Sequence, residues 1–286
     1  MVLPSLQKID VLMCIGSREV DGLFIDSLQS LLKYFPFLGH LYLVTPDKQA
    51  VQEKIKYLEF SQGATVFADE EVLDPCFLSE DGWYKQQVIK LEAPALCKTR
   101  FMACLSSDTL LLEATEWKDF FSQQGLPLLY YKQYNSSCRH HDYERGRMQN
   151  IERILKRKAI CSLSLVDFIL DFTIWDMQVL VLLKKYLVDL YGPQPFKTIS
   201  PGKCDTLAKK QGFGEWSLYA AFVLDVLQEK VEIKGFNKDY FVQIHSQKDL
   251  EAFAYDSKIV HFVAKDLNLE LIRSRIKQRE NSPNSL

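Results

Sequence analysis

Short apolar runs alternate with amphipathic stretches through the first seventy residues. The runs at 9–15, 41–44 and 64–67 have the length and composition of buried strands. Between them, 20–34 and 48–58 place apolar side chains at helical spacing. This strand–helix alternation predicts an α/β fold with a doubly wound, mainly parallel central sheet and helices on both faces. Ligands of such sheets bind beyond the carboxyl ends of the strands.

The pattern continues less regularly through the rest of the chain. It predicts helices at 83–91, 166–191 (largely helical) and 216–228, and strands at 101–105, 126–131, 241–244 and 259–263. The charged stretch at 135–160 is interpreted as an insertion or lid that contains a helix. We expect one domain over 1–276, with 101–105 as a central strand, and a disordered polar tail over 277–286.

Composition narrows the class of protein. The chain has 286 residues and a formal net charge of -2, which favours neither nucleic acid nor an anionic membrane as partner. No apolar run approaches the roughly 18 residues of a transmembrane helix, and the N-terminus lacks the pattern of a signal peptide. The seven cysteines include no CxxC pair, which favours free thiols in a reducing compartment. A cytoplasmic protein is therefore expected.

Three short motifs are candidates for chemistry. The first is Gly-Trp-Tyr-Lys-Gln-Gln at 82–87, which opens a helix, and the second is Ser-Ser-Asp-Thr at 106–109, after the strand at 101–105. The third is Gly-Glu-Trp-Ser-Leu-Tyr at 214–219, which opens an apolar helix. In this order they resemble an uncharacterised bacterial family of glycosyltransferase-like proteins with the GT-A fold, over about residues 8–265. That family has a Gly-Trp-x-x-Gln-Gln helix, an Asp-x-Asp motif followed by Thr, and a similar later helix start.

The resemblance implies a glycosyltransferase that moves a sugar from a nucleotide-sugar donor to a glycan or other hydroxyl acceptor. Departure of the diphosphate builds negative charge, which Mg²⁺ or Mn²⁺ neutralises. Asp108 is the expected catalytic and metal-binding carboxylate, and His261 is the preferred further metal ligand. Ser106 stands where the family has the first Asp, and a hydroxyl is a poorer metal ligand. The cation is therefore expected to bind only together with the nucleotide.

Further site residues follow from the same resemblance and, for Ser17 and Arg18, from their place at the end of the first strand. Glu215 is expected to act as the general base or to orient the acceptor. The expected donor-binding residues are Ser17, Arg18, Gln86, Gln87, Lys90 and Ser106. Each has a plainer alternative: a turn at 106–109, a helix-dipole partner at 215, solvated side chains on the helix at 83–91, a surface arginine at 18 and a structural histidine at 261.

Two other functions stay open at this stage. A catalytically inactive relative would keep the GT-A-like fold and bind a nucleotide or a partner, having lost the carboxylate at 106. An unrelated α/β interaction module would bind no nucleotide at all. The basic residues of 135–160 alternate with acidic ones, which is typical of a solvated helix, although contact with a membrane surface is an alternative.

Overall fold

The computed structural model describes residues 7–60, 63–133, 141–158, 166–168, 171–199, 213–228, 231–235, 241–253, 257–263 and 267–280. The strands are β1 Ile9–Cys14, β2 Leu38–Thr45, β3 Ala64–Ala68, β4 Phe101–Ser106, β5 Thr109–Leu111, β6 Leu129–Gln133, β7 Val166–Asp167, β8 Phe172–Asp176, β9 Ile233–Gly235, β10 Phe241–Ile244 and β11 Ile259–Phe262. The helices are α1 Phe24–Tyr34, α2 Lys48–Ile55, α3 Asp69–Val72, α4 Gly82–Leu91, α5 His141–Leu155, α7 Met177–Tyr191, α8 Pro195–Thr198, α9 Glu215–Ala221, α10 Gln247–Ala252 and α11 Leu269–Glu280.

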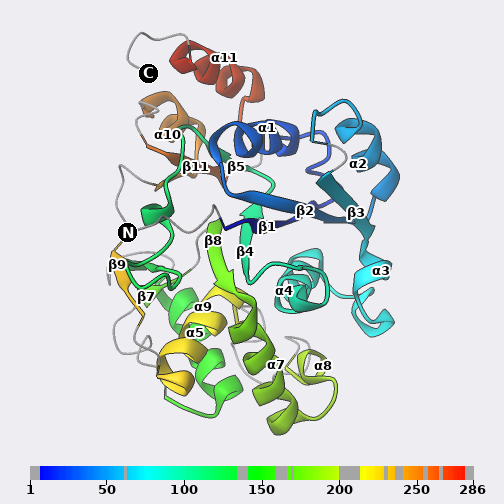
Figure 1. Ribbon diagram of the computed structural model, residues 1–286, viewed down its shortest axis with the longest axis vertical. Helices are drawn as coiled ribbons and strands as arrows, with labels where there is room; N and C mark the ends of the chain where they lie inside the picture. The colour runs from blue at the N-terminus through cyan, green and yellow to red at the C-terminus, as the bar shows by residue number, and fades with distance from the viewer. Residues whose placement is uncertain are drawn as a thin grey trace.

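A five-stranded sheet with the order β3-β2-β1-β4-β8 forms the centre of the fold (Figure 1). Strand β1 pairs in parallel with β2 on one side and with β4 on the other, and β2 pairs in parallel with β3. Only β8 runs antiparallel, at the edge beside β4. The predicted α/β fold with a mainly parallel central sheet is thus confirmed, and the predicted strand at 101–105 is an interior strand of it.

Alternation along β1 explains why helices cover both faces of the sheet. Leu12 and Cys14 pack into a core that also contains side chains of α4, α7 and α9. Val11 and Met13 point the other way, into a second core with side chains of α1 and α2. Successive residues of a strand point to opposite faces, so a strand that is apolar at every position must be covered on both.

Aspartates start three of the helices that flank the sheet. The side chains of Asp47, Asp81 and Asp176 accept hydrogen bonds from the backbone N–H groups of Ala50, Trp83 and Gln178, at the first turns of α2, α4 and α7. These bonds satisfy donors that the helix itself leaves without a partner. Helix α7 ends at Gly192, whose φ of 85° is a conformation that glycine adopts without strain.

The segment 166–191 differs from the prediction of a largely helical stretch. Its first part contains β7 and the buried strand β8, and only Met177–Tyr191 is helical. The sequence Phe-Thr-Ile-Trp of β8 is β-branched and aromatic, and all five residues of the strand are buried. The helix begins where Asp176 supplies its cap, so the helical pattern was extended too far towards the N-terminus.

A second sheet, β10-β11-β5, lies beside the central one at the end where β4 finishes. Strand β11 pairs in parallel with β10 and antiparallel with β5, which follows β4 directly. Helices α10 and α11 pack on this sheet through Leu250 and Ile272. Strands β7, β6 and β9 form a third, small sheet.

Helix α11 extends to Glu280 and so includes the first four residues, 277–280, of the predicted disordered tail. Its Arg279 donates to the backbone carbonyl of Leu112 and pairs with Glu113, which fixes the end of the helix. Residues 281–286 lie outside the described residues. No helix in the described part of the chain is both long enough and apolar enough to cross a membrane.

The charged stretch at 135–160 contributes to the core instead of forming only a solvated insertion. Met148, Ile151 and Leu155 of α5 are buried and pack into the core beneath the central sheet. Arg147 is also buried, at 5% exposure. The alternating charges therefore predicted only the solvated side of α5, and one basic residue, Arg147, is on the buried side. Residues 135–140 and 159–160 lie outside the described residues.

Helix α9 changes its geometry near its end. The predicted helix at 216–228 begins one residue earlier, at Glu215, and continues from Phe222 to Leu227 as a π-helix. Gln228 then ends it with a left-handed φ of 54°. All seven residues of α9 are buried, so it is a core helix, and its Trp216 packs into the core on one side of the central sheet.

A buried carboxylate ties the start of β1 to its neighbours. Asp10 accepts hydrogen bonds from the backbone N–H groups of His40, at 3.0 Å, and of Lys98 and Thr99, at 2.7 and 3.1 Å. Gly39 leaves room for it, because a Cβ there would lie 2.8 Å from Asp10 Oδ1. Asp10 thus joins β1, β2 and the turn before β4.

Replacing Asp10 by alanine is expected to lower the free energy of unfolding by about 2 kcal/mol, because three partly buried N–H donors lose their charged acceptor. Urea denaturation measures this. Asp21→Ala is the control: its side chain is 90% exposed, so the change should be within about 0.5 kcal/mol. Equal losses of stability in the two variants would show that the hydrogen bonds of Asp10 do not stabilise the fold.

Candidate functional site

A cavity of about 280 Å³ opens at the carboxyl ends of β1 and β4. Its wall comes from segments that are far apart in the sequence: the ends of these strands, α4, α5, α9, the start of β8, and β11. The lining residues are Cys14, Glu19, Trp83, Gln86, Lys90, Leu105, Ser106, Ser107, Asp108, Arg147, Asp171, Glu215, Trp216 and His261. The cavity therefore lies where a doubly wound sheet is expected to bind its ligand.

A second cavity, of about 200 Å³, adjoins the first, because both are lined by Cys14 and Gln86. It lies over the ends of β1 and β2 and is bordered by the loop that contains Gly16 and Ser17. Asp69 lines it too and pairs with Lys85 at 2.8 Å. The two cavities together form an elongated site with one end over β2 and the other over β4.

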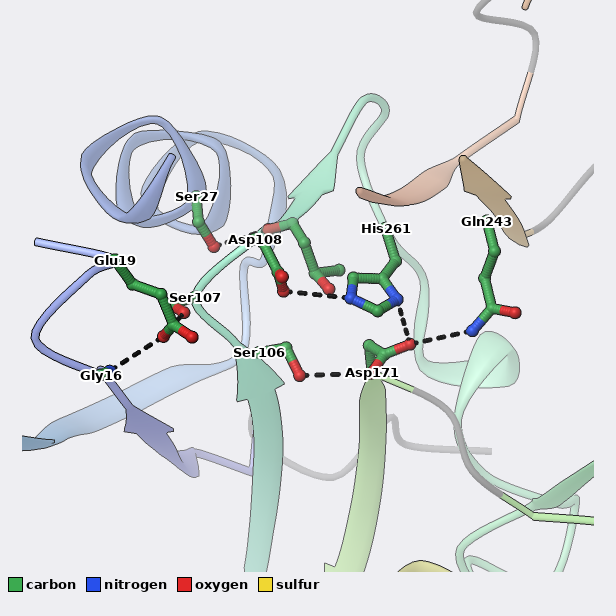
Figure 2. Close-up of polar contacts among 10 residues, drawn as sticks. Gly16, Glu19, Ser27, Ser106, Ser107, Asp108, Asp171, Gln243 and His261 are labelled. Carbon is green, nitrogen blue, oxygen red and sulfur yellow. Dashed lines mark hydrogen bonds and ion pairs between the residues drawn. The ribbon is translucent and has the colours of Figure 1, made fainter. Parts of the chain in front are cut away.

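His261 lies between two carboxylates (Figure 2). Its Nε2 is 3.1 Å from Asp108 Oδ1, and its Nδ1 is 2.5 Å from Asp171 Oδ2. The local backbone fixes this arrangement: His261 is opposite Thr109 in the β11–β5 pair, and the N–H of Phe262 donates to the carbonyl of Asp108. Asp108 is 35% exposed at its side chain and Asp171 only 8%, so Asp108 is on the cavity side.

The charges of this group favour a protonated histidine. Burial by itself lowers the pKa of His261, but the fields of Asp171 and Asp108 outweigh it and raise the pKa to about 10. Burial likewise raises the pKa of Asp171, but His261 beside it outweighs that effect and holds the pKa below its usual range. An imidazolium between two carboxylates is therefore the form expected at neutral pH.

Asp171 reaches this place because β8 is antiparallel to β4. The start of β8 then lies at the end of β4, where the N–H of Ser106 donates to the carbonyl of Asp171. The Ser106 hydroxyl donates to Asp171 Oδ1 at 3.3 Å, and Gln243 Nε2 donates to Oδ2 at 3.2 Å. The Asp171 carboxylate thus connects the central sheet with the second sheet.

The other wall of the cavity contains a buried ion pair. Lys90 Nζ is 2.7 Å from Glu215 Oε1, with side-chain exposures of 5% and 1%. The ammonium also lies over the ring of Trp216, 3.7 Å from its centroid. Burial lowers the pKa of Lys90, but the Glu215 carboxylate outweighs burial, so the pKa is raised and the lysine is charged.

Two further groups shape the mouth of the site. Glu19 Oε2 accepts hydrogen bonds from the N–H of Gly16, at 2.9 Å, and from the hydroxyl of Ser107, at 2.5 Å, and so joins the loops that follow β1 and β4. Burial raises the pKa of Cys14 to about 12, so this thiol is neutral and unsuited to act as a nucleophile.

The residues present fit a divalent cation only in part. Two adjacent ligands of an octahedral ion with bonds of about 2.1 Å lie about 3 Å apart. Asp108 Oδ1 and His261 Nε2 are 3.1 Å apart, which matches this spacing. A cation there must displace the Nε2 proton, while Asp171 can keep its contact with Nδ1. Within the described ranges, no group of three or more acidic, histidine or cysteine side chains offers a complete site. The remaining ligands must come from water or from a bound molecule.

The structure brings most of the predicted site residues together. Asp108, Glu215, Gln86, Lys90, Ser106 and His261 line the first cavity, and Ser17 lines the second. Gln87 lines neither, because it is one position from Gln86 on α4 and its side chain is buried at 1% exposure. Arg18 is exposed and lines neither cavity.

Sequence reasoning missed Asp171 and Arg147 as site residues. Asp171 lies inside a stretch that looked helical, and Arg147 lies in a stretch that looked solvated. A signal for Asp171 was present: an acidic residue directly before a wholly apolar segment is a candidate for the end of a buried strand. For Arg147 the sequence holds no comparable signal.

Comparison with protein families gives one match. The model of a family of unknown function, DUF6492, covers residues 17–265, which is most of the chain. The chain belongs to the DUF6492 family. A search of curated proteins found no match. The matched range of this DUF6492 chain contains every residue that lines the first cavity except Cys14.

Removing the charge of Glu215 is expected to destabilise the folded protein. Glu215→Gln should lower the free energy of unfolding by about 3–5 kcal/mol, because it leaves the Lys90 ammonium buried without its counter-ion. The double variant Lys90→Met/Glu215→Gln should recover most of this loss. Chemical denaturation of all three proteins measures both effects.

Glu232→Gln is the matched control, because it breaks a half-exposed pair with Lys234 and should cost less than about 1 kcal/mol. A double variant that is no more stable than Glu215→Gln would show that the cost does not come from an uncompensated Lys90.

Proposed function

We propose that this DUF6492 protein binds a nucleotide sugar in the two adjoining cavities and transfers the sugar to a hydroxyl acceptor. The observation that carries this proposal is the pair of Asp108 Oδ1 and His261 Nε2, 3.1 Å apart at the carboxyl ends of parallel strands. An oxygen and a nitrogen ligand at this spacing suit a divalent cation that accompanies a diphosphate.

The charges along the first cavity support a cation as part of the ligand. Four acidic residues line it, against Lys90, Arg147 and His261 as bases. Lys90 is already paired with Glu215, and His261 with two carboxylates. The lining thus holds four negative and three positive side chains, so a bare diphosphate would meet a net negative charge. A magnesium or manganese complex of the diphosphate removes that repulsion, as the loss of the carboxylate at 106 already led us to expect.

Each end of the site has a proposed task. The second cavity, bordered by Gly16, Ser17 and Asp69, takes the nucleoside. Asp108 and His261 hold the cation, which stabilises the negative charge of the leaving diphosphate. Lys90 and Gln86 face the donor from α4, and Trp83, which is 42% exposed, borders the opening through which an acceptor enters.

One observation favours binding without catalysis as a second candidate. Glu215, the proposed base, has Oε1 bound to Lys90 and Oε2 enclosed, without a hydrogen bond to any described residue. A base must contact the acceptor hydroxyl, so Glu215 acts only if this helix end opens when substrate binds. If it does not open, the protein binds nucleotide without transferring sugar.

Calorimetric titration with a panel of nucleoside diphosphates and nucleotide sugars, with Mn²⁺ or with EDTA, tests the proposal. We expect at least one nucleotide to bind more tightly with Mn²⁺ than with EDTA. Asp108→Ala should reduce the Mn²⁺-dependent gain by at least about tenfold, since even residues that only orient a ligand have effects of that size. Donor hydrolysis or transfer should be lost in the same variant.

Asp189→Ala, on the exposed side of α7, is the control and should bind as the unchanged protein does. Binding of no nucleotide in the panel would overturn the proposal in both forms. Nucleotide binding without donor turnover would select the non-catalytic form.

A further inference from the structure

Asp171 has a position that neither the motifs nor the proposed function assigns. It is 6% exposed and directly precedes β8. Three polar side chains contact its carboxylate. These are the Ser106 hydroxyl, the Gln243 amide and His261 Nδ1, at 3.3, 3.2 and 2.5 Å. Figure 2 shows that they come from β4, β10 and β11, so a single carboxylate receives one contact from each of three strands.

The geometry fixes which nitrogen of His261 faces the cavity. Nδ1 is buried and lies 2.5 Å from Asp171 Oδ2, a charge contact that lacks the alignment of a hydrogen bond, whereas Nε2 lies 3.1 Å from Oδ1 of Asp108, the more exposed of the two carboxylates. Gln243 is the register partner of His261 in the β10–β11 pair, and it holds the same oxygen of Asp171. The ring therefore has little freedom to turn.

We propose that Asp171 is a positioning residue that holds the Nδ1–H of His261, so that Nε2 and Asp108 Oδ1 together form the protein's half of a divalent-cation site. A carboxylate behind a ligating histidine fixes the tautomer and the ring plane and raises the basicity of the ligating nitrogen. Asp171 itself does not contact the cation. This inference rests on the proposed function for the role of the cation, but not for the geometry of the three residues.

The arrangement also explains how one buried aspartate is tolerated without a metal. Two neutral donors and one imidazolium satisfy the carboxylate of Asp171. When a cation takes the Nε2 side, the Nδ1 contact and the two neutral donors remain. Asp171 is therefore satisfied in both states, as a positioning residue must be.

Line broadening by Mn²⁺ in the NMR spectrum of the full chain, labelled with ¹⁵N in its histidine rings, tests this role. Small amounts of Mn²⁺ alone broaden the resonances of a ring that the ion contacts only briefly, so this measurement detects the protein's half of the site even though the ion stays bound only together with a nucleotide. His261→Gln identifies the His261 signals among the five histidines. We expect selective broadening of His261, and Asp171→Asn should raise the Mn²⁺ concentration that produces it by about 10–100-fold.

Asp176→Asn is the matched control. Asp176 is equally buried, at the other end of β8, and pairs with Arg100. Both substitutions should lower the melting temperature, but only Asp171→Asn should change the response to Mn²⁺. If Asp171→Asn does not fold, Asp171→Glu against Asp176→Glu serves instead, and only Asp171→Glu should need several-fold more Mn²⁺.

Two results would overturn the inference: no broadening of His261 in the unchanged protein, or the same Mn²⁺ response in the Asp171 variant as in its control. The proposed function survives either result only if a nucleotide still binds more tightly with Mn²⁺ than with EDTA, which would place the cation without His261 or without help from Asp171. Conversely, if His261 responds to Mn²⁺ but the protein binds no nucleotide, the cation site would be supported and the glycosyltransferase hypothesis would be rejected.

Discussion

The antiparallel pairing of β8 with β4 is the constraint on which the rest of the site depends. It adds an edge strand to an otherwise parallel sheet and turns the start of that strand towards the ligand-binding end. Asp171 is therefore at the end of β4, where it can meet His261 and Gln243 of the second sheet. A parallel strand in the same place would have put its carboxyl end there and left the two sheets without this connection.

Two buried charge systems face each other across the cavity and constrain it differently. The Lys90–Glu215 pair is buried, and the ammonium lies over the Trp216 ring. Removing only one partner would therefore lower the stability of the protein, because the other charge would stay buried without a counter-ion. The Asp108–His261–Asp171 group is open on the Asp108 side. The first system thus fixes the positions of α4 and α9, while the second keeps one carboxylate and one imidazole nitrogen available to a ligand.

The sequence predicted the central sheet well, because strands such as β1 and β4 contain uninterrupted apolar runs, at 11–14 and 101–105, that are followed by turn residues. It missed β8 altogether, because 166–191 was predicted to be largely helical. Here an apolar strand leads directly into an apolar helix, and only Asp176 separates them. Through motif order it also predicted Asp108 and Glu215 as residues of one site, and both line the first cavity. It did not identify Asp171, because the residues before α7 were taken as helical and the Ser106 hydroxyl that donates to it is 65 residues away in the sequence.

The serine at 106 and the aspartate at 171 are complementary. By resemblance, position 106 should be the first carboxylate of an Asp-x-Asp motif, and its absence seemed to leave a single acid at the strand end. In space, however, a carboxylate lies beside it, because Asp171 Oδ1 is 3.3 Å from Ser106 Oγ. A second carboxylate at 106 would meet Asp171 within a hydrogen-bond distance and be repelled, whereas a hydroxyl donates to it. The site therefore has two carboxylates near His261, one from the motif and one from the residue before β8, and the Ser106 hydroxyl donates to the second.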